Sequence, residues 1–212
     1  MGTIKKGILG GFSGKVGTVV GASWRGIAYM RSLPQKVRNP RTDLQRSQRT
    51  KFALALNFLK PMNALLRTGW KLYAHRQSPI NAAMSYTLAN AISGTYPDYE
   101  IDPSKVLISR GTLTPAANAT ATISSGAIVF EWDDNSGSST AKQTDKALLA
   151  VVNPAKIEAV FNAAGAERTE GTQTIALPND WAGATVEAYM GFVSEDGKEV
   201  ANSVYLGNFV IT

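Results

Sequence analysis

Residues 10–16 are the one stretch whose composition could serve phosphate chemistry, since they read G-G-F-S-G-K-V. A phosphate-binding loop of the Walker type needs a glycine five positions before Gly14, where Leu9 stands. It also needs Ser or Thr directly after Lys15 to bind magnesium, and Val16 occupies that position. The stretch fails the pattern twice, so we predict neither nucleotide binding nor any other cofactor.

Side chains suited to acid–base or metal chemistry are few and scattered. His75 is the only histidine and cysteine is absent, so the chain offers neither a histidine pair nor a thiolate metal site. We expect His75 to contact helix-terminal carbonyls or solvent. Residues 133–137, with Asp145 beyond them, lack the spacing of an EF-hand calcium loop and are interpreted as a solvated strand connection. The sequence predicts no catalytic residue, no metal site and no enzyme.

The charge of the chain is divided sharply between its two ends. Residues 1–76 hold 15 Lys and Arg and one acid, whereas residues 77–212 hold 7 Lys and Arg and 15 acids, giving formal charges of +14 and −8. Such a basic segment can bind nucleic acid, or the acidic part of the next copy in an assembly. Trp24 and Tyr29 are available in the same segment for stacking or arm contacts. The basic residues expected to make these contacts are Lys5, Lys6, Lys15, Arg25, Arg31, Arg38, Arg41, Arg46 and Arg49.

Residues 1–36 are predicted to form a basic, glycine-rich arm. Eight of the 19 glycines of the chain lie between Gly2 and Gly26. Two strand-like runs, at 16–20 and 27–30, predict a β-hairpin with a loose loop between them. Because an isolated hairpin is marginally stable in water, we expect the arm to be ordered by packing on the helices or on a neighbouring subunit.

Residues 37–94 are predicted to be helical. Thr42 and Gln45 have the spacing of a capping box, which predicts a helix start at this point. Phe52 and Leu59 fall on one apolar stripe of that helix. Short connections favour a small antiparallel three-helix bundle. The predicted helices cover about 42–59, 61–74 and 78–93.

Residues 105–212 change character after residues 95–104, which are predicted to be an extended linker that packs against another surface and is not a loose tether. Strand-like runs recur at regular spacing, with turn residues between them. Their number and length predict an antiparallel β-sandwich of the immunoglobulin type. The predicted strands are 106–109, 119–124, 127–132, 147–153, 156–162, 172–177, 185–194 and 203–211.

The sandwich segment resembles a fibronectin type III-like layout over residues 115–212. The resemblance rests on Trp132 in an early strand, the run A-L-L-A-V-V-N in the next, and the segment T-V-E-A-Y-M-G-F-V near the end. It implies that Trp132 fills the sandwich core and that Tyr189 packs from the penultimate strand. Phe130 lies on the same strand face as Trp132, because the two are two residues apart. A layout of this kind implies a fold and no activity.

The predicted fold class is therefore α+β: a basic β-hairpin arm, a three-helix bundle and a C-terminal sandwich. The chain as a whole resembles a family of Bacteroidota proteins known only as a domain of unknown function, above all through G-I-L-G-G-F-S-G-K-V-G-T-V-V-G-A-S-W-R-G-I and N-P-R-T-D-L-Q-R-S-Q-R. Residues 16–90, with N-P-R-T-x-x-Q-x-x-R ahead of short aromatic-rich helices, are similar to segments of tailed-phage and prophage virion structural proteins. That similarity implies a component of a virion or phage-like particle.

Two functions follow from these features. The first is a structural subunit of a virion, tail-like tube or filament, which binds itself head to tail through the arm and its oppositely charged ends, and binds other virion proteins. The alternative is a nucleic-acid-binding protein that uses the basic arm and first helix. No run of the sequence reaches the length of a membrane span, so no membrane partner is expected. We expect synthesis in the cytoplasm and incorporation into an assembled particle.

Overall fold

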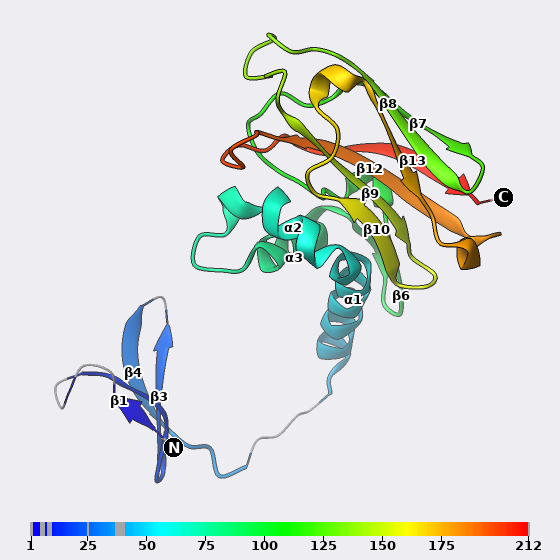
Figure 1. Cartoon of the computed structure of the whole chain (residues 1–212). Coiled ribbons are helices and arrows are strands. Elements are labelled where there is room, and N and C mark those ends of the chain that lie inside the picture. Colours follow the sequence, from blue (N-terminus) through cyan, green and yellow to red (C-terminus); the bar gives the residue numbers. More distant parts are fainter. Residues whose placement is uncertain (1, 5–6, 8–9, 25, 37–40, 212) are drawn as a thin grey trace. The chain divides into compact units, whose positions relative to one another are not determined.

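The computed structural model describes residues 2–4, 7, 10–24, 26–36 and 41–211. It divides into two compact units, residues 1–42 and residues 43–212 (Figure 1). The helical region, the expected linker and the sandwich, which were predicted as successive domains, all lie within the second unit.

The first unit is an antiparallel sheet with the strand order β1-β2-β3-β4. The predicted hairpin is wrong in its strand boundaries, because residues 16–20 contain a turn at Gly17 and residues 21–24 are a strand. Gly17 and Gly26 have the positive φ that tight hairpin turns need. The strands are β1 (Thr3–Ile4), β2 (Phe12–Val16), β3 (Val19–Trp24) and β4 (Ile27–Ser32).

Gly21 lets two segments of this sheet lie directly against each other. A Cβ at this position would overlap the backbone of Phe12, and a Cβ at Gly11 would overlap the side chain of Ala28. The start of β2 therefore crosses over one face of β3 and β4. Only glycine permits so close an approach of two backbones, which gives the high glycine content of the segment a structural reason.

The second unit begins with three α-helices connected by 3-10 turns. α1 starts directly after Thr42, where the capping-box spacing predicts it. Pro61 cannot donate a helical hydrogen bond, and the chain passes through a 3-10 turn there. Ser78 caps α3, because its Oγ accepts a hydrogen bond from the Asn81 N–H at 3.3 Å. The elements are α1 (Asp43–Leu59), a 3-10 turn (Lys60–Met62), α2 (Asn63–Gly69), a 3-10 turn (Lys71–Tyr73) and α3 (Pro79–Asn90).

The expected linker is instead a short β-hairpin of β5 (Ile92–Thr95) and β6 (Asp98–Ile101). The segment packs on the helical layer through Tyr99, which contacts α1. The Tyr99 hydroxyl lies 2.6 Å from the Ser47 hydroxyl, and the Lys51 ammonium lies 4.7 Å from the centre of the Tyr99 ring.

The rest of the unit is an antiparallel β-sandwich, as predicted. One sheet has the order β10-β9-β12-β13 and the other has the order β11-β8-β7. The run at 106–109 is not a strand, whereas each of the other predicted runs overlaps an observed one. The strands are β7 (Ala117–Ser124), β8 (Ala127–Asp133), β9 (Lys146–Asn153), β10 (Glu158–Asn162), β11 (Thr172–Ala176), β12 (Thr185–Val193) and β13 (Val204–Val210).

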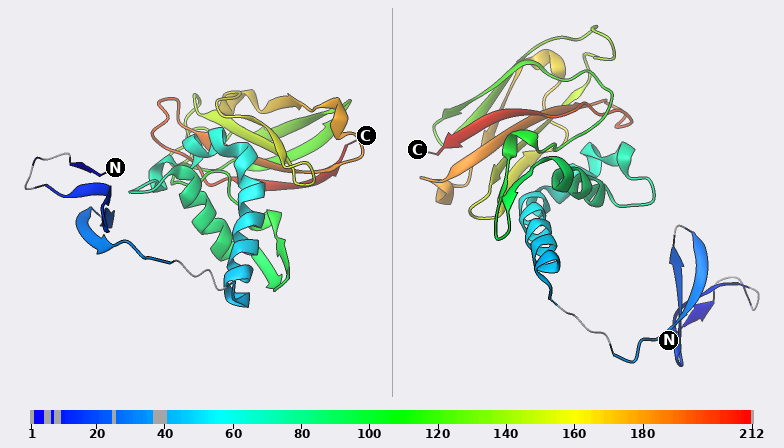
Figure 2. Two further views of the ribbon diagram at one scale, coloured as in Figure 1. Left: turned by 90° about the horizontal axis from the view of Figure 1, so that it is seen from below. Right: turned by 180° about the vertical axis from the view of Figure 1, so that it is seen from behind.

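The four-stranded sheet is covered on both faces. One face packs on the three-stranded sheet, where Phe130 and Trp132 lie in the core between the sheets. The helices cover the other face, as the two views of Figure 2 show. This burial on both sides explains why β9 and β12 are apolar along nearly their whole length instead of alternating.

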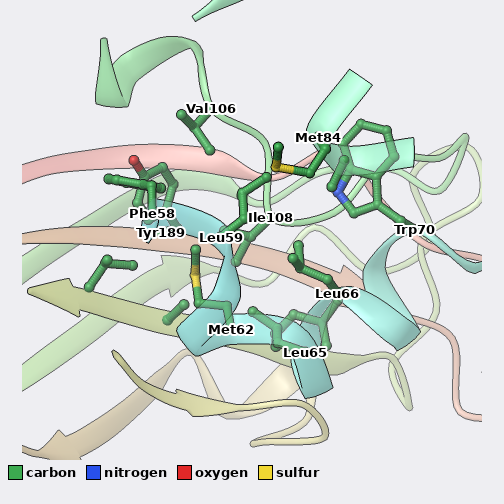
Figure 3. Packing of buried hydrophobic residues seen from close by; sticks show 14 of the residues in the cluster. Phe58, Leu59, Met62, Leu65, Leu66, Trp70, Met84, Val106, Ile108 and Tyr189 are labelled. Carbon is green, nitrogen blue, oxygen red and sulfur yellow. The ribbon is translucent and has the colours of Figure 1, made fainter. Parts of the chain in front are cut away.

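The core between the helices and the sheet corrects two expectations. The helices do not form a bundle with a core of their own, because their buried residues share one cluster with residues of the sheet. Tyr189 is fully buried, but it lies in this cluster and not in the sandwich core. Its ring meets Phe58 of α1 edge-on at 6.3 Å (Figure 3), and its hydroxyl donates to the Pro103 carbonyl at 2.8 Å.

A buried ion pair closes one end of the sandwich. Arg168 and Asp145 are both fully buried, and the guanidinium donates to the Asp145 carboxylate through Nη2 at 3.0 Å and Nε at 3.2 Å. The same guanidinium donates to Asn135 Oδ1 at 2.6 Å and the Thr114 carbonyl at 3.0 Å. Burial lowers the pKa of Arg168, and Asp145 opposes that shift. Asp145 is therefore a structural residue of the interior, and the expectation that it is a solvated loop residue is wrong.

Candidate assembly surface

The sheet of the first unit has almost no hydrophobic core. Among its described residues only Gly21 is buried. Large apolar side chains are exposed instead, from 37% for Leu33 to 70% for Met30. A contiguous group of exposed apolar side chains on a folded segment marks a surface that another molecule covers. The apolar residues exposed in this unit are Ile4, Val16, Trp24, Ile27, Tyr29, Met30 and Leu33.

The strand register places five residues on one face of the sheet; each is either an exposed apolar residue or a predicted contact residue. Val20 of β3 pairs with Lys15 of β2 and with Arg31 of β4, so the two cations flank it on the same side of the sheet. Two further pairs on this side, Ala22 with Tyr29 and Trp24 with Ile27, extend the face, because side chains alternate along each strand. We call this the basic–aromatic face; it consists of Lys15, Trp24, Ile27, Tyr29 and Arg31.

The two faces of the sheet differ in how they are covered. Gly21 and Ala28 lie on the opposite face, where the start of β2 packs over them. No segment among the described residues of 1–42 buries the basic–aromatic face, whose five members are all exposed. The start of β2 thus covers only part of the opposite face, on which Met30 stays 70% exposed. The basic–aromatic face presents cations, aromatic rings and an isoleucine.

The remaining predicted contact residues are placed elsewhere. Arg41 precedes α1, and Arg46 and Arg49 lie in its first two turns, all exposed. Arg46 and Arg49 form a second basic region at the start of the second unit. The other four, Lys5, Lys6, Arg25 and Arg38, lie outside the described residues.

The first half of α1 also exposes apolar side chains. Leu44 is 84% exposed and Phe52 is 48% exposed, although Phe52 was expected on the buried stripe. The buried residues of the helix are Ala55, Phe58 and Leu59, so its apolar stripe reaches the core only in the second half. A groove of about 490 Å³ runs along the exposed part; it is lined by Gln45, Gln48, Arg49, Phe52, Ala53 and Leu56.

Acidic side chains lie on the outer face of the three-stranded sheet. Glu131 and Asp133 of β8 are exposed, because Phe130 and Trp132 alternate with them into the core. Thr120 and Thr172 flank Glu131 on the neighbouring strands. This face therefore pairs carboxylates with short polar side chains, which suits contact with a basic surface.

The structure locates the other chemical candidates without joining them into a site. His75 is exposed in the connection between the Lys71–Tyr73 turn and α3. No group of three or more His, Cys, Asp or Glu among the described residues has the arrangement of a metal site. Within the described part of the chain, no helix is both long enough and apolar enough to cross a membrane. The hydrogen bonds predicted between Thr42 and Gln45 stay a prediction.

Sequence reasoning missed two arginines that the structure makes prominent. Arg168 is buried in the sandwich, and Arg110 lies against three aromatic rings of the helical layer. Neither belongs to a motif, and each meets its partners only through contacts distant in sequence. Ile27 and Met30 were recognised as strand residues, but the sequence did not reveal that nothing in the described part of the arm covers them.

The fold and the surface define a protein with a helix-backed β-sandwich and a basic, coreless N-terminal sheet. Over residues 11–207 the chain matches the model of the family of unknown function DUF6266, and it belongs to this family. This confirms the expectation of a family without an assigned function. No curated protein matches the chain. Among solved structures, the fn3 domain of the human collagen alpha-1(XX) chain is similar over 49% of this chain and 91% of its own, with 10% sequence identity and a TM-score of 0.34.

Proposed function

We propose that this protein is a non-enzymatic structural subunit that assembles with copies of itself through its N-terminal sheet. The observation that carries the proposal is a folded sheet whose large apolar side chains are exposed and whose only buried described residue is Gly21. Ile27 and Met30 have no chemistry to offer a substrate. Burying each of them completely would contribute about 1.5–3 kcal/mol, which makes a protein surface the natural occupant.

Two oppositely charged surfaces of the chain favour a head-to-tail contact between copies. The basic–aromatic face carries Lys15 and Arg31, and the acidic outer face of β8 carries Glu131 and Asp133. Contact between these two different surfaces of successive copies is heterologous, so it builds a ring or an open helical array. We propose a virion, a tail-like tube or a filament as the product, in keeping with the similarity of residues 16–90 to virion structural proteins. Synthesis in the cytoplasm and contacts with other particle proteins belong to the same proposal.

Nucleic-acid binding is the second candidate, and the basic–aromatic face is the observation that favours it. Trp24 and Tyr29 lie on the same face as Lys15 and Arg31. Proteins that bind single strands combine aromatic stacking with basic side chains in this way. The exposed aliphatic residues favour assembly over this alternative, because an isoleucine neither stacks on a base nor pairs with a phosphate.

The first test is the particle size of the nuclease-treated full chain, measured by sedimentation and negative-stain electron microscopy. We expect the wild type to form assemblies and the double variant Ile27→Thr, Met30→Thr to lose them. Both changes keep strand propensity and remove apolar surface. Val210→Thr is the matched control, since Val210 is 57% exposed on a sandwich strand. A wild-type chain that stays monomeric at all concentrations would refute the assembly proposal.

A charge-swap test separates assembly from nucleic-acid binding. The variant Lys15→Glu, Arg31→Glu should lose either activity, whereas Glu131→Lys, Asp133→Lys should lose assembly alone. Mixing the two variants should restore assembly if the basic–aromatic face contacts the acidic face of β8. If the second variant still assembles and the first loses only a salt-dependent retention of single-stranded DNA, nucleic-acid binding is the function.

A further inference from the structure

Arg110 lies in an aromatic pocket of the helical layer. The centre of its guanidinium is 4.5 Å from the ring centre of Tyr73, 5.2 Å from that of Tyr86 and 6.0 Å from that of Trp70. Trp70 forms the floor, since it is 1% exposed and its indole N–H donates to the Leu107 carbonyl at 3.2 Å. The pocket holds about 280 Å³, and its remaining lining residues are Gln77, Ala82, Ser85 and Ala89.

The backbone fixes Arg110 at the edge of this pocket. Its N–H donates to the Gly69 carbonyl at the end of α2 at 2.9 Å. The next residue, Gly111, donates to Asn202 Oδ1 at 3.1 Å. Arg110 is thereby held between the helical layer and the sandwich, both within the second unit, and its side chain is half-buried.

Stacking leaves the hydrogen-bonding edge of a guanidinium unused. A ring contacts the flat face of the group, while its five N–H donors lie in the plane and form a fork that matches a carboxylate. Among the described residues, no oxygen accepts a hydrogen bond from the Arg110 guanidinium and no carboxylate pairs with it. Three rings position the cation, and its donors face no acceptor in the part of the chain that the structure describes.

The same chain shows how a ring-stacked arginine is completed. Arg168 lies 3.8 Å from the centre of the Phe192 ring. Its fork is filled by the Asp145 carboxylate, together with Asn135 Oδ1 and a backbone carbonyl. Arg110 has the rings without the carboxylate.

We propose that the Arg110 pocket is a binding site for a carboxylate group. The guanidinium of Arg110 would donate two parallel hydrogen bonds to it, as such pairs commonly do. Tyr73 and Tyr86 would hold the guanidinium in plane, and the side chains of Gln77 and Ser85 supply further polar groups in the lining. The site does not depend on the N-terminal sheet and is independent of the proposed assembly surface.

The surroundings of the pocket favour an anion of this kind. Residues 44–97 contain no Asp or Glu and seven Lys and Arg, so no acidic residue of α2, of α3 or of α1 beyond Asp43 competes for Arg110. A phosphate group would need several converging cations or backbone N–H groups, whereas the lining contains one cation. A single carboxylate matches one arginine in both charge and geometry.

Two sources could supply the carboxylate: an acidic side chain on the sandwich of a second copy, or a small free carboxylate. The probe for the shared chemistry is N-acetyl-L-aspartate N-methylamide, and the asparagine analogue is its neutral control. Saturation-transfer NMR observes the small molecule, so it works with the full chain in any state of assembly. We expect saturable binding of the aspartate probe to the wild type and at most weak binding of the asparagine analogue.

The variants decide whether Arg110 makes the contact. Arg110→Gln should weaken binding at least about tenfold, and Arg110→Lys should weaken it as well because lysine lacks the planar fork. Arg67→Gln is the matched control, since Arg67 is an exposed arginine of α2 outside the pocket. Near-ultraviolet circular dichroism checks that each variant keeps its aromatic packing.

Equal binding of the probe by the wild type and by either Arg110 variant would overturn the proposal, as would equal binding of the asparagine analogue or no saturable binding at all. Once binding is established, sedimentation distinguishes the sources. If Arg110→Gln lowers self-association and the aspartate probe competes with it, a second copy supplies the carboxylate. If self-association is unchanged, the ligand is a free carboxylate.

Discussion

Replacing Asp145 by asparagine should destabilise the second unit strongly. The substitution keeps the size of the side chain and one oxygen acceptor, but removes the only carboxylate that pairs with the buried Arg168 among the described residues. Breaking a buried pair by removing one partner costs about 3–5 kcal/mol, because the other charge is left uncompensated. Since the amide oxygen can still accept a hydrogen bond from the Lys142 N–H, now made by Asp145 Oδ2 at 2.8 Å, we expect a loss of about 3 kcal/mol.

That loss corresponds to a fall in Tm of about 6–12 °C, at about 2–4 °C per kcal/mol for a chain of this length. Urea unfolding followed by near-ultraviolet circular dichroism measures the free energy directly. Asp134→Asn is the control, because Asp134 is exposed in the same loop and its change should cost under about 0.5 kcal/mol.

A double-mutant cycle with Arg168→Gln tests the cause. If the charge pair is responsible, the double variant should lose less stability than the two single variants lose together, by at least about 1 kcal/mol. A loss for Asp145→Asn no larger than that of Asp134→Asn would refute the reasoning. It would mean that Asn135 and the backbone carbonyls around Arg168 satisfy the guanidinium without a carboxylate.

Two further predictions concern the core between helices and sheet. Phe58→Ala should cost about 3–5 kcal/mol in a single unfolding transition, whereas Phe52→Ala, on the exposed part of the same helix, should cost under about 1 kcal/mol; a loss of helix signal ahead of the sheet signal would contradict a shared core. Stability should also fall at alkaline pH, because burial raises the pKa of Tyr189, and burial with a hydrogen bond to Glu187 raises that of Tyr205. The unfolded chain ionises these tyrosines near pH 10, so their contribution to the free energy of unfolding is complete below that pH and lost above it. Urea unfolding measured from pH 8 to 11 should show the stability falling as the pH rises. Unchanged stability over this range would contradict the prediction.

The strands of the sandwich could be predicted because local signals agree there. In residues 127–132 the large side chains of Ile128, Phe130 and Trp132 alternate with smaller or polar ones, and turn residues separate the runs. The face of Tyr189 could not be predicted in the same way. In β12 both faces are apolar, so the sequence of the strand does not reveal which face meets the other sheet and which meets the helices.

Most predictions that the structure overturns depend on contacts between residues distant in sequence. Phe52 has the right spacing for a buried stripe, but the part of α1 that carries it is not covered, and Ala55 and Phe58 are buried further along. Residues 95–104 have the composition of a linker, but most of them belong to the β5–β6 hairpin, from which Tyr99 packs against α1. Arg168 gives no local signal, since its partners lie between 23 and 54 residues away.

For the candidate surface, composition predicts which residues make contacts, and only the strand register shows that they share a face. The excess of basic residues identified Lys15, Trp24, Tyr29 and Arg31 as contact residues. Their arrangement depends on strand parity, and a strand placed at 16–20 gives the wrong parity because the chain turns at Gly17. Only the observed register puts the four side chains on one face.

The two units differ in how their order is stabilised, and this difference is the strongest argument for a partner. Fixing a backbone costs about 1–2 kcal/mol per residue. The second unit offsets that cost with two apolar clusters and a buried ion pair. The first unit orders four strands and, in its described part, buries only Gly21, so its own contacts offset little of the same cost. Under the assembly proposal, we expect a further surface to supply the missing burial and to cover the basic–aromatic face, whose five members are all exposed.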